Sequence, residues 1–112
     1  MPEPAAKAMD IEGWRKRIDE LDLRLVELIN QRAECAQRIG RLKQHSSMPI
    51  YEPDREKIIY ENIARTNAGP LSNMQLRQIY ERLIDVMRQV QQVDVLAEEP
   101  EPVNRTELES ND

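Results

Sequence analysis

The chain has 112 residues, of which 33% are charged, and it carries a formal net charge of −5 with only three Gly and no Phe. One domain is expected at this length. The abundance of helix-forming residues and the scarcity of β-branched and aromatic runs predict an all-α fold. Residues 1–96 hold 15 acids and 15 bases, whereas residues 97–112 hold six acids and one base. A neutral body argues against a general nucleic-acid binder, which needs a basic face.

Residues 1–9 are expected to be a disordered lead-in, and a first helix is expected from near Asp10, an N-cap residue type, to about His45. Apolar side chains recur along it at alternating spacings of four and three residues, which is typical of a coiled-coil seam. The seam positions are Trp14, Ile18, Leu21, Leu25, Leu28, Arg32, Cys35, Ile39 and Leu42. Such a helix spans about 50 Å, more than two shorter helices of one chain can cover. Either the helix breaks or a second copy of the chain packs along it, and we favour an intertwined homodimer with the long helices side by side.

Arg32 is the one charged residue of the seam. It either sets the helix register or extends its head to water, or it is buried and needs an anion from another helix or from a ligand. Lys43 lies on the same face, about 16 Å further along the axis. The two cations can lean toward a small ligand, although a lysine there can equally complement the helix C-terminus. The lone cysteine, Cys35, is expected to be a core residue, and its isolation favours a reducing compartment.

A second helix is predicted from about Pro53 to about Asn67, because proline suits the first turn of a helix and the Ala68-Gly69-Pro70 segment ends one. Arg55 and Glu56 lie in its first turn. Taken alone, they indicate an ordinary solvated helix start.

A third helix is predicted from Ser72, which forms a capping box with Gln75, to about Leu96. Gln91 lies at the edge of its apolar stripe and can face a pocket or water. Residues 97–112 are expected to be an acidic, disordered tail, because they lack the apolar surface needed to order themselves. The predicted organisation is thus one domain over residues 10–96 with three helices per chain.

Four segments combine residues in a recognisable type, order and spacing. They are W-R-x-R-I-D-E-L-D-x-x-L-V-E-L-I-N-Q-R from Trp14 to Arg32, I-G-R-L-K ending at Lys43, P-I-Y-E-P-D-R-E from Pro49 to Glu56, and Y-E-R-L-I-D-V-M-R-x-V-Q ending at Gln91. Together they resemble the all-helical AroQ class of chorismate mutase over about residues 10–93. The resemblance implies an intramolecular Claisen rearrangement of chorismate to prephenate, in phenylalanine and tyrosine biosynthesis, with no cofactor and no metal.

The resemblance also implies roles for individual residues. Arg32 would bind a substrate carboxylate, and Lys43 would contact a carboxylate and the ether oxygen. Gln91 would be the second donor to the ether oxygen. Glu56 would accept a hydrogen bond from the ring hydroxyl, with the backbone near Glu52 contributing. Arginine forks suit carboxylates, and donors suit the oxygen of a breaking ether bond.

Two further arginines follow from the same resemblance. Arg55 would add positive potential at the carboxylate end of the site. Arg15 matches an arginine that reaches into the partner subunit's site, and it lies about 25 Å from Arg32 along one helix, too far to share a small ligand within one chain. Met87 is also placed among the substrate-binding residues. It stands where the family usually has a small hydroxyl residue, so one carboxylate contact depends on this alignment.

Three alternatives remain beside the mutase. An isochorismate-pyruvate lyase would share the fold and the cationic site, but that family lacks the acid at the position of Glu56. A non-enzymatic helical dimer or partner-binding module would use the seam alone. A mutase regulated by another shikimate-pathway enzyme would have that enzyme as a partner, with a contribution from the tail. We expect a cytoplasmic protein with no membrane segment.

Overall fold

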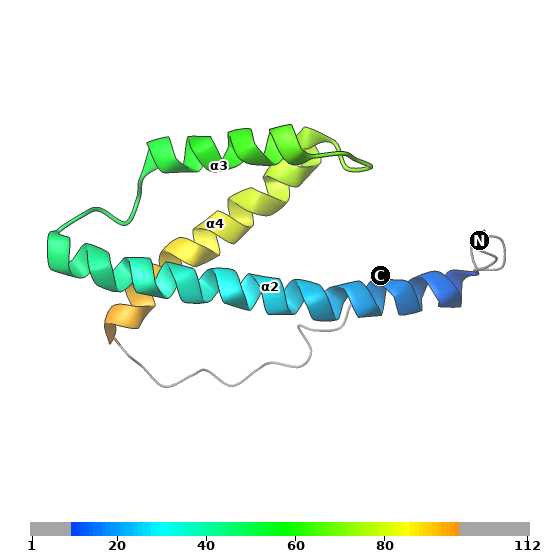
Figure 1. Cartoon of the computed structure of the whole chain (residues 1–112), viewed down its shortest axis with the longest axis horizontal. Coiled ribbons are helices and arrows are strands. Elements are labelled where there is room, and N and C mark those ends of the chain that lie inside the picture. The colour runs from blue at the N-terminus through cyan, green and yellow to red at the C-terminus, as the bar shows by residue number, and fades with distance from the viewer. Residues whose placement is uncertain (1–9, 97–112) are drawn as a thin grey trace. The chain divides into compact units, whose positions relative to one another are not determined.

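The computed structural model describes residues 10–96, which form three helices and no strand: α2 (Ile11–Ser46), α3 (Pro53–Thr66) and α4 (Asn73–Leu96) (Figure 1). The predicted three-helix, all-α chain is confirmed. The expectations for residues 1–9 and 97–112 lie outside the described residues. The described part falls into two compact units, residues 10–32 and residues 33–96, and α2 contributes to both.

Helix α2 begins where its capping residue predicts. The side-chain oxygen of Asp10 accepts a hydrogen bond from the N–H of Gly13 at 2.9 Å, and the Asp10 carbonyl accepts one from Trp14 at 3.1 Å. Along the unit of residues 10–32, the large apolar side chains are exposed apart from the half-buried Ile18, and Leu25 in the predicted seam is 53% exposed. Most of the seam in this unit is therefore left uncovered by the described residues.

In the unit of residues 33–96, the buried stripe of α2 is shifted by one residue from the predicted seam. Ala36, Gly40 and Lys43 are buried, whereas Cys35 is exposed. The prediction that Cys35 is a core residue is wrong for the single chain. The physical reason is steric, because small residues let the α4 backbone approach closely on the shifted face.

Gly40 marks this close approach. A Cβ atom at Gly40 would lie 2.8 Å from the carbonyl oxygen of Gln91 and 2.9 Å from its Cα atom, closer than real Cβ contacts allow. From α4, Ile84 and Met87 complete the small core of the unit. Close packing of this kind makes the position of Gln91 sensitive to the size of residue 40.

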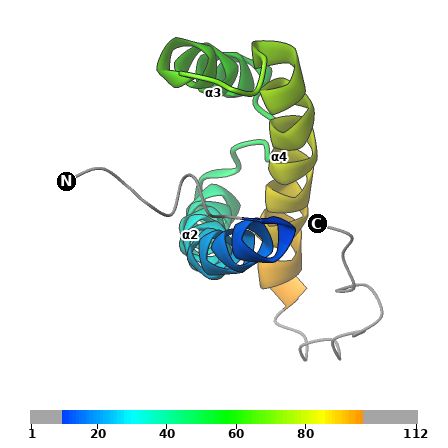
Figure 2. The ribbon, with the colours of Figure 1, turned by 90° about the vertical axis from the view of Figure 1, so that its right-hand side faces the viewer.

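Helices α3 and α4 are in contact and are joined by a short loop (Figure 2). Gly69 adopts a φ of +79°. The Asn67 side chain donates to the carbonyl oxygen of Leu71 and accepts from the N–H of Gly69, so the loop turns sharply. The capping box is confirmed: Gln75 N–H donates to Ser72 Oγ at 3.1 Å, and Ser72 N–H donates to Gln75 Oε1 at 3.0 Å. Across residues 10–96, no helix is long and apolar enough to cross a membrane.

Candidate active site

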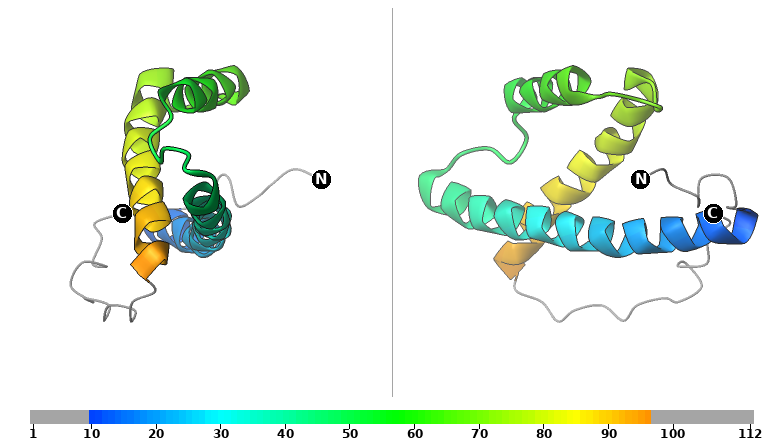
Figure 3. Two further views of the ribbon diagram at one scale, coloured as in Figure 1. Left: turned by 90° about the vertical axis from the view of Figure 1, so that its left-hand side faces the viewer. Right: turned by 45° about the vertical axis from the view of Figure 1, so that its right-hand side comes forward.

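After α2 ends, the chain reverses direction and lies against the last turns of that helix. Ser47 has a φ of +59°, and Met48 N–H donates to the carbonyl of Lys43 at 3.2 Å. These two features define a Schellman-type helix end. The connection that follows leads from α2 into α3 (Figure 3). Its last residues, Ile50 and Glu52, both bind the Lys43 side chain.

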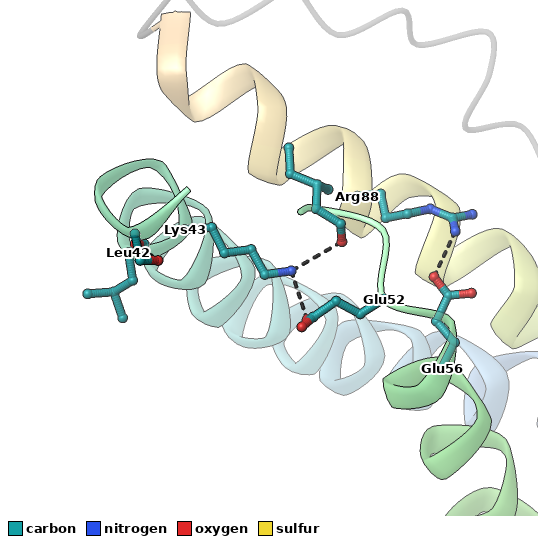
Figure 4. A network of polar contacts seen from close by, with 7 residues as sticks. Leu42, Lys43, Glu52, Glu56 and Arg88 are labelled. Carbon is teal, nitrogen blue, oxygen red and sulfur yellow. Dashed lines mark hydrogen bonds and ion pairs between the residues drawn. The ribbon is translucent and has the colours of Figure 1, made fainter. Parts of the chain in front are cut away.

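Lys43 is the most deeply buried charged residue among those described, with 6% of its surface exposed. Its Nζ atom donates to the carbonyl oxygen of Ile50 at 3.1 Å and lies 2.9 Å from Glu52 Oε2 (Figure 4). A buried ammonium group needs such partners because its desolvation is costly. The loop before α3 thus holds the cation in a fixed place.

Glu52 occupies the position that precedes α3, but its side chain does not cap the helix. Its carbonyl oxygen accepts the first helical hydrogen bond, from Glu56 N–H at 3.1 Å. The carboxylate is therefore available to pair with Lys43. From the sequence, only a backbone role is predicted for Glu52, and the ion pair with Lys43 is seen only in the structure.

Gln91 lies on the face of α4 that packs against Gly40. Its Oε1 atom is buried and has no hydrogen-bond partner among the described residues. A buried amide oxygen without a partner is unfavourable, and rotation of the terminal torsion by 180° exchanges it with the NH₂ group. The side chain therefore has unused hydrogen-bonding capacity in the protein interior.

Glu56, in the first turn of α3, faces α4. Its Oε2 atom lies 2.7 Å from Nη1 of Arg88, and the two side chains are 18% and 30% exposed (Figure 4). Glu56 is among the site residues predicted from the sequence, whereas Arg88 is not. An arginine directly after Met87, inside the quoted motif, was the only signal for it.

The other predicted site residues are more scattered. Arg55 is exposed at the start of α3, and Met87 is buried in the core. Arg32 is half-buried, and Arg15 pairs with Glu12 at 3.2 Å in the unit of residues 10–32. The roles predicted for these four residues stay predictions. Within residues 10–96, no three His, Cys, Asp or Glu side chains gather as metal ligands.

An open cavity of about 560 Å³ lies along α3 and α4. It is lined by Tyr51, Glu56, Tyr60, Arg77, Glu81 and Arg88. The Arg77 guanidinium stacks 4.0 Å from the centre of the Tyr60 ring. Burial, together with the Glu81 carboxylate, raises the pKa of Tyr60, so its phenol stays neutral at neutral pH. Of the predicted site residues, only Glu56 lines this cavity, so the cavity does not enclose the Lys43 and Gln91 side chains.

Comparison with known proteins assigns the chain to a family. The chorismate mutase type II family matches residues 14–92. A bifunctional chorismate mutase/prephenate dehydratase from Aquifex aeolicus is 37% identical over 79 residues, covering 67% of this chain and 22% of the relative. A 4-amino-4-deoxychorismate mutase from Streptomyces pristinaespiralis is 29% identical over 82 residues, covering 72% of this chain and 64% of the relative.

The fold agrees with this assignment. A crystal structure of chorismate mutase from Helicobacter pylori in complex with prephenate superimposes with a TM-score of 0.71 and 30% identity, covering 80% of this chain and 97% of that one. The chain therefore belongs to the chorismate mutase type II family. It spans about a fifth of the length of the bifunctional relatives it matches.

Proposed function

We propose that this chain catalyses the rearrangement of chorismate to prephenate. In that reaction the C–O bond of the enolpyruvyl ether breaks while a C–C bond forms within the same molecule. A protein can accelerate it by holding the compact reactive conformer and by stabilising the negative charge that grows on the ether oxygen. The observation that carries the proposal is the buried ammonium group of Lys43, held by Glu52 and Ile50.

Lys43 has the properties of an electrostatic catalyst. An ammonium group has three N–H donors, and Ile50 and Glu52 engage two of them. The third is left for a ligand oxygen. Because the group is already desolvated and oriented, little reorganisation free energy is needed when charge develops on that oxygen. Gln91, with its amide rotated to present NH₂, is the second donor in this proposal.

Glu56 is assigned to the ring hydroxyl of chorismate, which donates to its carboxylate. The name of the S. pristinaespiralis relative describes a substrate with an amino group in place of the oxygen at ring position 4. The hydroxyl substrate is proposed for this chain. Arg32 and Arg55 are assigned to the substrate's carboxylates, because a guanidinium group can donate two parallel hydrogen bonds to one carboxylate.

A homodimer is part of the proposal. The exposed seam of residues 10–32 supports it, because a row of large apolar side chains in contact with water is unfavourable. A second copy of the same helix presents a matching row. In such a dimer, Arg15 of one chain would reach the site of the other.

Activity is tested with the purified full chain and chorismate, following the loss of chorismate and identifying prephenate as the product. The expected rate is far above the uncatalysed background, and Lys43→Met is expected to lose about 100- to 1000-fold in kcat. Glu52→Gln serves as the companion variant, because it removes the negative charge beside Lys43 but keeps the ammonium group and an oxygen that can accept from it. A rate at background for the unmodified chain would refute the proposed activity.

The shared site is tested by mixing chains. Arg15→Ala and Arg32→Ala chains are each expected to be nearly inactive as homodimers. Heterodimers should regain about one working site, because one of their two sites then contains both an intact Arg15 and an intact Arg32. Heterodimers that form but stay as inactive as either parent would contradict the contribution of Arg15 across the interface.

Two wider predictions accompany this function. The lone cysteine supports a reducing compartment, and a cytosolic location remains the prediction. Association with another shikimate-pathway enzyme remains a prediction as well. Co-purification of the full chain with such an enzyme, and a rise in mutase rate on mixing, would be its test.

A further inference from the structure

The ion pair between Arg88 and Glu56 gives the site a feature beyond the proposed function, on which this inference rests. The pair joins residues 32 positions apart in the sequence, across α3 and α4, at 2.7 Å. Arg88 is held from two further sides, with Nη2 3.6 Å from Asp85 Oδ1 and Cζ 5.3 Å from the centre of the Tyr51 ring. The guanidinium is therefore fixed beside the carboxylate.

The position of Arg88 determines the electrostatic potential that a ligand meets beside Glu56. The bond from Arg88 goes to Oε2, so Oε1 is the oxygen left to accept a hydrogen bond from a substrate. The Glu56 carboxylate and the Arg88 guanidinium together carry no net charge. The Asp85 carboxylate beside Arg88 is balanced in turn by Arg82, at 2.8 Å. A neutral hydroxyl group needs only an acceptor, which Oε1 supplies. An ammonium group at the same place gains far less electrostatic interaction energy. Its attraction to the Glu56 carboxylate is offset by its repulsion from the Arg88 guanidinium.

We infer that Arg88 is a specificity-determining residue that selects a neutral hydroxyl over an ammonium group at the ring position facing Glu56. It acts through Glu56 and needs no contact with the substrate. The two substrates compared are chorismate and its 4-amino-4-deoxy analogue, whose primary amine is protonated at neutral pH. Without the positive charge of Arg88, Glu56 would be an unpaired carboxylate that favours the cation.

The size of the effect follows from the charges. Two like charges about 6 Å apart, at an effective dielectric constant of about 20, change a binding constant by about 100-fold. Partial exposure of Arg88 weakens this through solvent screening. The expected change in preference is therefore about 10- to 100-fold.

The experiment measures kcat/KM for both substrates with the full chain at pH 7. Arg88→Gln is expected to raise the ratio of amino to hydroxy substrate by about 10- to 100-fold. Arg88→Lys keeps the charge and should leave the ratio near that of the unmodified chain. Arg38→Gln is the matched control, since Arg38 pairs with Glu34 at 3.0 Å on α2 and that pair shares no residue with the pair of Arg88 and Glu56.

A purely structural ion pair would give a different result. Its loss would lower kcat/KM for both substrates together and leave their ratio unchanged in Arg88→Gln, which would overturn the inference. The unmodified chain supplies a second test that does not depend on a variant folding. Its discrimination should shrink as the pH rises through the pKa of the substrate's amine, because the neutral amine is no longer repelled.

A ratio that is flat with pH in the unmodified chain would also overturn the inference. The proposed function fails separately, by the absence of chorismate turnover in the unmodified chain. Turnover of chorismate with an unchanged ratio in Arg88→Gln refutes only the role of Arg88.

Discussion

The two parts of helix α2 present their apolar side chains differently. Over residues 10–32, large side chains such as Trp14 and Leu25 lie exposed in the seam, whereas over residues 33–46 the buried positions are the small residues Ala36 and Gly40 together with Lys43. The seam itself stays exposed in the second part, at Ile39 and Leu42, and the buried residues there form a second stripe one residue away. Among the described residues, the first part has no buried position of this kind, whereas the second packs against α4 through Gly40.

This difference separates two requirements of the proposed enzyme. Large apolar residues suit a surface that buries much area against a second copy, with about 25 cal/mol gained per Å² of apolar surface. Small residues suit a helix crossing at which backbone atoms must come close. Substitutions in the first part should therefore affect assembly first, and substitutions in the second part should affect chemistry or packing.

The largest effect is expected in the first part. Leu25→Glu would place a carboxylate in the seam, where an unpaired buried charge costs about 4 kcal/mol or more. That corresponds to about a 1000-fold weaker dimer, so light scattering should detect monomers and turnover should collapse with them. Leu23→Glu is the control, because Leu23 is off the seam and 75% exposed. A Leu25→Glu chain that remains dimeric would contradict the seam interface.

The next effect concerns chemistry in the second part. Gln91→Ala should lower kcat by about 100- to 1000-fold with little change in KM, because a donor to the ether oxygen acts mainly in the transition state. Gln92→Ala, at the exposed neighbouring position, should be close to the unmodified chain.

Gln91→Glu refines this expectation. A protonated glutamic acid can donate to the ether oxygen, whereas the ionised form repels it, so activity should fall as the pH rises through the pKa of that group. The pH dependence of kcat is the measurement. A flat profile with an unmodified kcat would show that residue 91 does not face the ether oxygen.

A smaller effect is expected from Gly40→Ala. The added methyl group would collide with the backbone of Gln91, and such overpacking typically costs about 1–3 kcal/mol. Thermal denaturation should show the loss of stability, accompanied by a decrease in kcat as Gln91 shifts. Gln37→Ala, at an exposed position of the same helix, should change neither the stability nor kcat. Unchanged stability in Gly40→Ala would indicate that α2 and α4 can separate freely at this crossing.

The smallest effect should come from a position outside both parts of α2. Ser72→Ala removes the side-chain cap of α4 and should cost about 1 kcal/mol of folding stability. Dimerisation and turnover should be unchanged, because neither the seam nor Lys43 is involved. Chemical denaturation measures the loss, and a change in kcat would show that the cap also positions the site.

The helices could be predicted closely because their ends carry local signals. Asp10, Pro53 and the Ser72–Gln75 capping box act within one turn of the chain, so the sequence alone contains the information. The buried face of α2 could not be predicted from the same pattern. Alternating spacing identifies an apolar stripe but not which partner covers it, and here Gly40 and Lys43 mark a second stripe one residue away.

The same limit applies to the candidate site. Lys43 and Glu56 could be named from a resemblance, but their partners depend on which side chains meet across elements. The pairs Lys43–Glu52 and Glu56–Arg88 join residues from different elements or from a loop and a helix. A charged residue at a helix start has an ordinary solvated explanation in the sequence, and only the fold reveals the contact.

The enclosure of Lys43 has a consequence for chemical labelling. An electrophilic lysine reagent reacts with the neutral amine, which attacks it, and the reagent can reach this amine only when the segment over residues 47–52 moves away from Nζ. The exposed Lys57 on α3 has no such barrier. The ratio of the two labelling rates therefore measures how often the segment opens, and a bound ligand that closes the site should slow the reaction at Lys43 alone.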